Sequence, residues 1–208
     1  MTGILALQGG GPFVANDPLD RQLLTEVGAE RVVVLPTAEA FENPADLLVT
    51  ASAWGERLGV EIEALKVYGR SEALDPGPAA VVADARAVYV VGDSPIHLRS
   101  VLTDTPLYEA LVGVLAGGGL VVGVAGSAAA LCDPMTDPRG GAFTIGLGLV
   151  EQLALATEIE GWTDERLHRT LELADVPVVE LPTGSAIVRR DRRWTTDGDV
   201  VLHGDLPA

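Results

Sequence analysis

Residues 120–131 have the sequence Leu-Val-Val-Gly-Val-Ala-Gly-Ser-Ala-Ala-Ala-Leu. The apolar start, the small residues at the centre and the alanine run that follows predict a buried strand that turns sharply into a helix. A nucleophile elbow has this shape, because its central residue is strained between strand and helix and its neighbours must be tiny. Ser127 carries the only hydroxyl group in the stretch.

The stretch belongs to a longer run without charge, which extends from Ala110 to Cys132. Its length is about that of a segment that spans a bilayer. Three consecutive glycines interrupt the run, and acidic residues, Glu109 and Asp133, flank it where cationic anchors would be expected. We therefore interpret the run as the end of a helix, a glycine turn, a buried strand and the elbow.

Apolar runs elsewhere in the chain predict three further buried strands. They cover Gly3–Leu7, Arg31–Leu35 and Ala87–Val91, and each ends at a loop rich in glycine or hydroxyl groups. Residues at helical spacing lie between the strands, as in Asp17–Val27 before Gly28. Strands that alternate with helices predict an α/β three-layer sandwich with a mostly parallel, flavodoxin-like central sheet.

The last third of the chain has a different pattern. A helix capped by its first residue is predicted over 163–174, and short strand-like pieces follow at 178–181, 185–188 and 200–203. These pieces predict a small antiparallel C-terminal extension of the sheet. No repeat, low-complexity tract or linker divides the sequence, so we expect a single domain over residues 1–208.

The composition excludes several classes of partner. The 208 residues include 14 Lys or Arg and 30 Asp or Glu, a net charge of −16 at pH 7, which repels nucleic acid and anionic lipid. We therefore expect no nucleic-acid and no membrane partner. Hydrophobic residues make up 48% of the chain, enough for a sizeable core. The single cysteine, Cys132, cannot form an internal disulfide, and the first residues lack the basic region of a signal peptide, so we expect a cytoplasmic protein.

Several loops together resemble those of a known superfamily. They are residues 6–11, 34–38, 90–95, the elbow, and 133–141. On these residues the chain is similar to the class I glutamine-amidotransferase-like hydrolases, in particular to the serine peptidase family of aspartyl dipeptidases and cyanophycinases. The resemblance implies a serine nucleophile at the elbow, a later histidine, an acidic partner and glycine loops that donate hydrogen bonds to the oxyanion.

An alignment without a gap places Ala125 at the nucleophile position of the family's elbow. The histidine would be expected near residues 157–162, and no histidine lies between Leu131 and Leu167. The acidic partner would be expected near residues 182–185, which contain no carboxylate. The resemblance therefore predicts a member with a degenerate triad, which binds a small molecule, a short peptide or a protein partner.

An active serine hydrolase, with Ser127 as a shifted nucleophile, is the alternative. Backbone N–H groups of the glycine loops and the elbow would then bind the oxyanion. The candidates are Gly10, Gly11, Gly92, Asp93 and Gly126. Against this alternative, a serine in a first helical turn is commonly a cap, and a serine nucleophile needs a positioned base. The sequence places none of the histidines convincingly as that base; they are His97, His168 and His203.

Other polar residues could border the same crevice. Three of them are Glu158, Arg139 and His97. An acidic crevice for a cation or an amine could include Asp93, Asp133, Glu158 and Glu160, although a solvated acidic face is the default. A third hypothesis is an amide-handling enzyme in which Glu158 acts with a bound water. No cluster has the spacing of a metal site, so we expect neither a metal nor a cofactor. The sequence does not decide whether the protein forms a homodimer.

Overall fold

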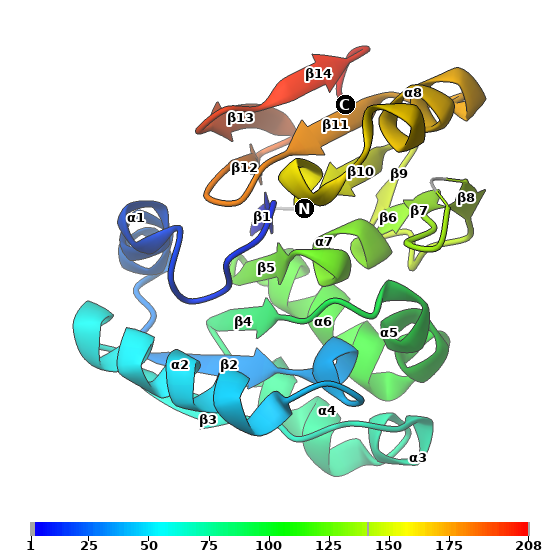
Figure 1. The fold of residues 1–208 in the computed structure, drawn as a ribbon. Coiled ribbons are helices and arrows are strands. Elements are labelled where there is room, and N and C mark those ends of the chain that lie inside the picture. The colour runs from blue at the N-terminus through cyan, green and yellow to red at the C-terminus, as the bar shows by residue number, and fades with distance from the viewer. Residues whose placement is uncertain (1–2, 141, 208) are drawn as a thin grey trace.

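The computed structural model of this chain describes residues 3–140 and 142–207. Its central seven-stranded sheet has the strand order β13-β12-β1-β5-β4-β2-β3 (Figure 1). The strands are β1 (Ile4–Gln8), β2 (Arg31–Leu35), β3 (Glu61–Ala64), β4 (Ala87–Val90), β5 (Leu120–Val124), β12 (Ala186–Arg190) and β13 (Arg193–Asp197). The first five of these pair in parallel, whereas β12 and β13 form an antiparallel hairpin at the side of β1.

Helices cover both faces of the sheet, because successive strand residues point to opposite sides. In β1, Ile4 and Ala6 belong to one core, and Leu5 and Leu7 belong to the other. The helices of the first core are α1 (Asp17–Val27) and α2 (Pro44–Leu58). The helices of the second core are α3 (Arg70–Ala73), α4 (Pro76–Ala83), α5 (Pro95–Leu102), α6 (Pro106–Ala116) and α7 (Gly126–Leu131). The predicted three-layer α/β sandwich is confirmed.

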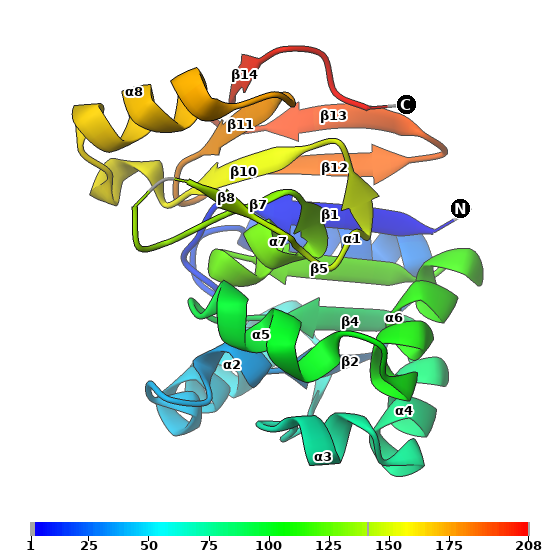
Figure 2. The ribbon, with the colours of Figure 1, turned by 90° about the vertical axis from the view of Figure 1, so that its right-hand side faces the viewer.

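The C-terminal part adds small sheets and one further helix (Figure 2). One sheet contains β10 (Ala154–Thr157), β11 (Val178–Leu181) and β14 (Val201–His203). Two more pair β6 (Cys132–Asp133) with β9 (Val150–Glu151) and β7 (Met135–Thr136) with β8 (Phe143–Thr144). The other elements are α8 (Asp164–Leu173) and the 3-10 turns η1 (Thr37–Glu39) and η2 (Ile159–Gly161). The predicted extension is confirmed, but β10 and β11 pair in parallel because α8 provides the crossover between them.

The charge-free run from Ala110 to Cys132 is divided mainly among α6, β5 and α7, as the sequence predicts. Within the described ranges, no helix is long and apolar enough to cross a membrane. The predicted helix over Asp17–Val27 is also confirmed, and Gly28 ends it with a φ of +63°, a left-handed conformation that glycine adopts without strain. The short helices α3 and α4 are not predicted by the sequence analysis.

A buried hydrogen-bond cluster fixes the end of β1. Asp20 of α1 accepts hydrogen bonds from three side chains: Gln8 Nε2 at 2.6 Å, the Tyr89 hydroxyl at 3.0 Å and Trp54 Nε1 at 3.2 Å. Burial raises the pKa of Asp20 to about 6 despite these donors. The backbone oxygen of Gln8 accepts the N–H of Ala125 at 3.0 Å, so the cluster helps to position the residue that follows β5.

Candidate functional site

The elbow forms at Ala125, between β5 and α7. Its backbone has a φ of 56° and a ψ of −130°, a conformation that costs free energy in residues other than glycine. Ala125 is completely buried. At the next residue, Gly126, a Cβ atom would lie 2.9 Å from the backbone carbonyl group of Asp93, so only glycine fits without a shift. The chain therefore has the backbone of a nucleophile elbow, with a methyl group at its central position.

Ser127 lies in the first turn of α7 and is buried. Its hydroxyl donates to the backbone oxygen of Gly92 at 3.0 Å, and its N–H donates to the same oxygen at 2.9 Å. Both bonds connect α7 to the loop after β4. The hydroxyl group of Ser127 thus donates its proton to a backbone acceptor inside the protein.

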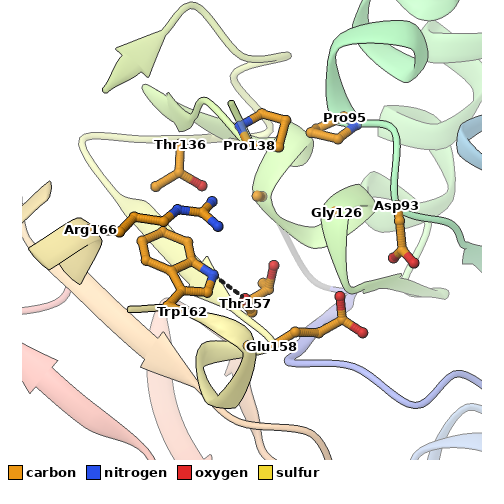
Figure 3. A pocket seen from close by; sticks show the side chains of 11 residues that line it. Asp93, Pro95, Gly126, Thr136, Pro138, Thr157, Glu158, Trp162 and Arg166 are labelled. Atoms are coloured by element: carbon orange, nitrogen blue, oxygen red, sulfur yellow. Dashed lines mark hydrogen bonds between the residues drawn. The ribbon is translucent and has the colours of Figure 1, made fainter. Parts of the chain in front are cut away.

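A cavity of about 220 Å³ lies beside the elbow (Figure 3). Its walls come from the loop after β4, from α7, from the segment around β7, and from the chain between β10 and α8. The lining residues include Asp93, Gly126, Thr136, Glu158, Trp162 and Arg166. In open α/β sheets, ligands bind in a crevice beyond the carboxyl ends of the strands, and this cavity has that position.

One wall of the cavity is acidic. The carboxylates of Asp93 and Glu158 point toward the same space (Figure 3). Burial and repulsion from neighbouring carboxylates, Asp93 first, raise the pKa of Glu158 to about 7. Burial also raises the pKa of Asp93, although the N–H of Gly126 opposes this change. Near neutral pH Glu158 can therefore both take and give a proton, a property of a general acid or base.

Backbone contacts hold Glu158 at this wall. Glu158 has a φ of 50°, and its N–H donates to the backbone oxygen of Gly9 at 3.0 Å. A Cβ atom at Gly10 would lie 2.6 Å from Cγ of Glu158, so the glycine loop after β1 makes room for this side chain. Glu160 accepts the N–H of Thr183 at 3.2 Å, which fixes η2 against the loop after β11.

The opposite wall is basic and aromatic. The guanidinium group of Arg166 lies 3.6 Å from the centre of the Trp162 ring. Trp162 Nε1 donates to the backbone oxygen of Thr157 at 3.1 Å, which fixes the ring. The Thr163 side chain accepts the N–H of Arg166 at 3.2 Å and so caps α8. Nε of Arg166 is buried and has no hydrogen-bond partner among the described residues, and burial lowers the pKa of this guanidinium.

The structure brings Asp93, Gly126 and Glu158 together at the cavity. Of the other sequence-predicted residues, Gly10 and Gly11 lie behind Glu158 and beside Thr183, and Gly92 packs against η1. These three glycines are not among the residues that line the cavity.

Two further predicted residues also lie away from the cavity walls. Arg139 is exposed, and its guanidinium pairs with the carboxylate of Asp137 at 2.7 Å. His97 Nε2 lies 2.9 Å from the backbone oxygen of Tyr68. Neither residue lines the cavity: Arg139 pairs within its own loop, and His97 of α5 contacts the segment between β3 and α3.

Comparison with known proteins identifies the family. The sequence profile of peptidase family S51 matches residues 5–196. The chain belongs to peptidase family S51. The crystal structure of a peptidase from an acI-B1 Actinobacterium has a TM-score of 0.85 and 25% sequence identity, over 96% of this chain and 90% of that one.

A second solved structure has the same fold as this chain. It is a protein from Listeria monocytogenes EGD-e assigned as peptidase E, with a TM-score of 0.74 and 17% identity, over 95% of this chain and 98% of that one. A search of curated proteins finds no match. The resemblance to a serine peptidase family, predicted from the loops, is confirmed.

The sequence analysis did not predict Trp162 and Arg166 as site residues of this S51 chain. One signal could have found them. Arg166 lies in the first turn of a helix that begins after Thr163, where the helix dipole disfavours a cation. A cation in that unfavourable place, four positions after a tryptophan, indicates a separate role for the pair. Thr136 was missed because β7 is too short for a hydrophobic period.

Proposed function

We propose that this S51 chain binds a small molecule or a short peptide in the elbow cavity and does not hydrolyse it by a serine mechanism. The observation that carries the proposal is Ala125 at the strained centre of the elbow. In a serine hydrolase the residue at this point carries the attacking oxygen. A methyl group can neither attack a carbonyl carbon nor release a proton. The elbow therefore has the backbone conformation of a nucleophile elbow but no nucleophile at its centre.

The positions of the histidines support the proposal. The chain has three histidines, and none of them lines the cavity. His168 is exposed on α8 and lies 3.3 Å from the carboxylate of Glu172, and His203 lies 2.5 Å from that of Glu180. A serine nucleophile needs an imidazole or a similar base within hydrogen-bond distance. The cavity offers only carboxylates for that task.

The surroundings of Ser127 argue against its use as a shifted nucleophile. Its hydroxyl would have to leave the backbone oxygen of Gly92 and turn out of a completely buried position. That change would leave a buried acceptor with one hydrogen bond fewer, which costs free energy. Ser127 is better explained as the residue that fastens α7 to the loop after β4.

Hydrolysis assays test the proposal directly. Purified protein is incubated with acidic dipeptides and with an acyl ester, and Ser127→Ala is measured beside the wild type. We expect no turnover above the buffer rate for either protein. Turnover in the wild type that Ser127→Ala abolishes would overturn the proposal. Turnover that Ser127→Ala retains would support hydrolysis without a serine.

Hydrolysis by water is a second candidate function, and the pKa of about 7 at Glu158 favours it. Glu158 would take a proton from a water as the water oxygen attacks a carbonyl carbon, and the departing amine would take the proton back. The rate would then rise with pH through about 7, as Glu158 ionises. Glu158→Gln would remove both the rise and the activity, whereas Ser127→Ala would leave them in place.

We also propose that the protein is cytoplasmic. Its single cysteine, Cys132, is buried, and burial raises the pKa of the thiol well above its usual range. Such a thiol is a small apolar core residue rather than a disulfide partner. Fractionation of the source cells, followed by detection with an antibody, tests this location; recovery with the membrane or the medium would contradict it.

A further inference from the structure

The two walls of the elbow cavity carry opposite charges. Asp93 and Glu158 lie at one side, and Arg166 lies at the other, over the ring of Trp162 (Figure 3). We propose that the cavity selects a ligand that places an ammonium or guanidinium group beside Asp93 and Glu158 and a carboxylate against Arg166. The inference rests on the proposed binding function and names its ligand class, short basic amino-acid derivatives or peptides.

The acidic wall has no internal counterion. The ion pairs of the described residues include neither Asp93 nor Glu158. The charges of Asp93, Glu160 and Glu39 act on Glu158, and all three repel its carboxylate. Two partly buried carboxylates that face one space are costly unless a cation joins them. A ligand ammonium would supply that cation, whereas a ligand carboxylate at this wall would add to the repulsion.

The ion pairs of the described residues do not include Arg166 either. Nε of Arg166 is buried without a hydrogen-bond partner in the described part of the chain. Asp137 attracts Arg166, but the carboxylate of Asp137 already pairs with Arg139. Stacking on Trp162 holds the guanidinium flat, so that its donors meet a carboxylate with little loss of freedom.

Since the cavity holds about 220 Å³, smaller than a site for a drug-sized ligand, one amino-acid unit or a dipeptide is the fitting size.

In this chain the wall beside the elbow is formed by Asp93 and Glu158, so a positive group is favoured there. The methyl group of Ala125 and the acidic wall thus lie at the same site.

Three matched probes test the inference by isothermal titration calorimetry at pH 8. Nα-acetyl-L-lysine carries an ammonium and a carboxylate, Nα-acetyl-L-lysine amide lacks the carboxylate, and N-acetyl-L-aspartate carries only acidic groups. We expect N-acetyl-lysine to bind at least tenfold tighter than either of the others. If N-acetyl-aspartate binds tightest, or if no probe binds at millimolar concentration, the inference is wrong.

Variants assign the two walls separately. Glu158→Gln should weaken both lysine probes by about tenfold, because both place an ammonium at the acidic wall. Arg166→Gln should weaken N-acetyl-lysine by a similar factor and leave its amide unchanged. Glu165→Gln and Arg169→Gln, at exposed positions of α8, are the matched controls and should change neither affinity. Equal loss of both probes in Arg166→Gln, with the fold intact by circular dichroism, would contradict the assignment of the basic wall.

The outcomes separate this inference from the proposed function. Tight binding of N-acetyl-aspartate alone would reverse the polarity but leave the proposed binding function in place. Serine-dependent hydrolysis of a lysyl dipeptide would overturn the proposed function but support the polarity.

Discussion

At the scale of single residues, the elbow depends on a glycine that has no room for a side chain. A Cβ atom at Gly126 would lie 2.9 Å from the backbone of Asp93. We predict that Gly126→Ala displaces the loop after β4, destabilises the protein by about 1–3 kcal/mol and weakens N-acetyl-lysine binding. Urea unfolding and calorimetry measure the two effects.

Gly113→Ala is the matched control for that substitution. Gly113 lies inside α6, and a Cβ atom there would meet nothing within 4 Å. Alanine should therefore stabilise the helix by about 0.5–1 kcal/mol and leave ligand binding unchanged. A similar loss of stability in both variants would show that close approach to Asp93 is not what requires Gly126.

A second residue-scale prediction concerns Asp20. Its pKa is raised from an ordinary 3.8 to about 6, mainly by burial, so the folded state disfavours its charged form. Its contribution to stability is then fully present below pH 4 and is lost as the pH rises through 6. We predict that the free energy of unfolding of the wild type, relative to Asp20→Asn, falls by about 2.4 kcal/mol between pH 4 and pH 7. A difference that does not change with pH would contradict the raised pKa.

At the scale of elements, the first turn of α8 orients the basic wall. The Thr163 side chain accepts the N–H of Arg166, the residue that stacks on Trp162. Thr163→Ala should cost about 1 kcal/mol of stability and, because the first turn frays, lower the affinity for N-acetyl-lysine. Thr105→Ala removes the equivalent cap of α6, which does not line the cavity, and should cost stability alone. Equal affinities in the two variants would mean that the cap does not orient Arg166.

The lengths of the elements explain why the sequence predicted the sheet better than the site. The strands of the central sheet are continuous apolar runs buried on both faces, so β2 and β5 are visible in the sequence with their bounds. The second half of the site comes from two-residue strands and a 3-10 turn, which have no period to detect. Asp93, Gly126 and Glu158 could be predicted because they follow strands or the elbow. Arg166 was missed because its place in the first turn of α8 is the one signal in the sequence, and its packing on Trp162 is a tertiary contact.

At the scale of the whole molecule, the acidic wall is assembled from segments far apart in the chain. Glu39 lies in η1, Asp93 follows β4, and Glu158 follows β10. Repulsion from Asp93 and Glu39 contributes to the raised pKa of Glu158, and repulsion from Asp93 contributes to that of Glu39. Composition alone could give the net charge of −16 but not this concentration of it at one end of the sheet. The fold therefore brings carboxylates from separate segments to one place, where a cation is favoured.

The charge of the acidic wall should make the affinity for N-acetyl-lysine depend on pH. With a pKa of about 7, Glu158 is mostly ionised at pH 8 and mostly protonated at pH 6, whereas both charges of N-acetyl-lysine stay constant over this range. Because the ammonium favours the ionised carboxylate, its affinity should fall about tenfold from pH 8 to pH 6, with uptake of a proton on release of the ligand. Glu158→Gln should bind more weakly at pH 8 and show a much smaller change with pH. Affinity that rises toward pH 6 in the wild type would place the ammonium away from Glu158 and contradict the assignment of the acidic wall.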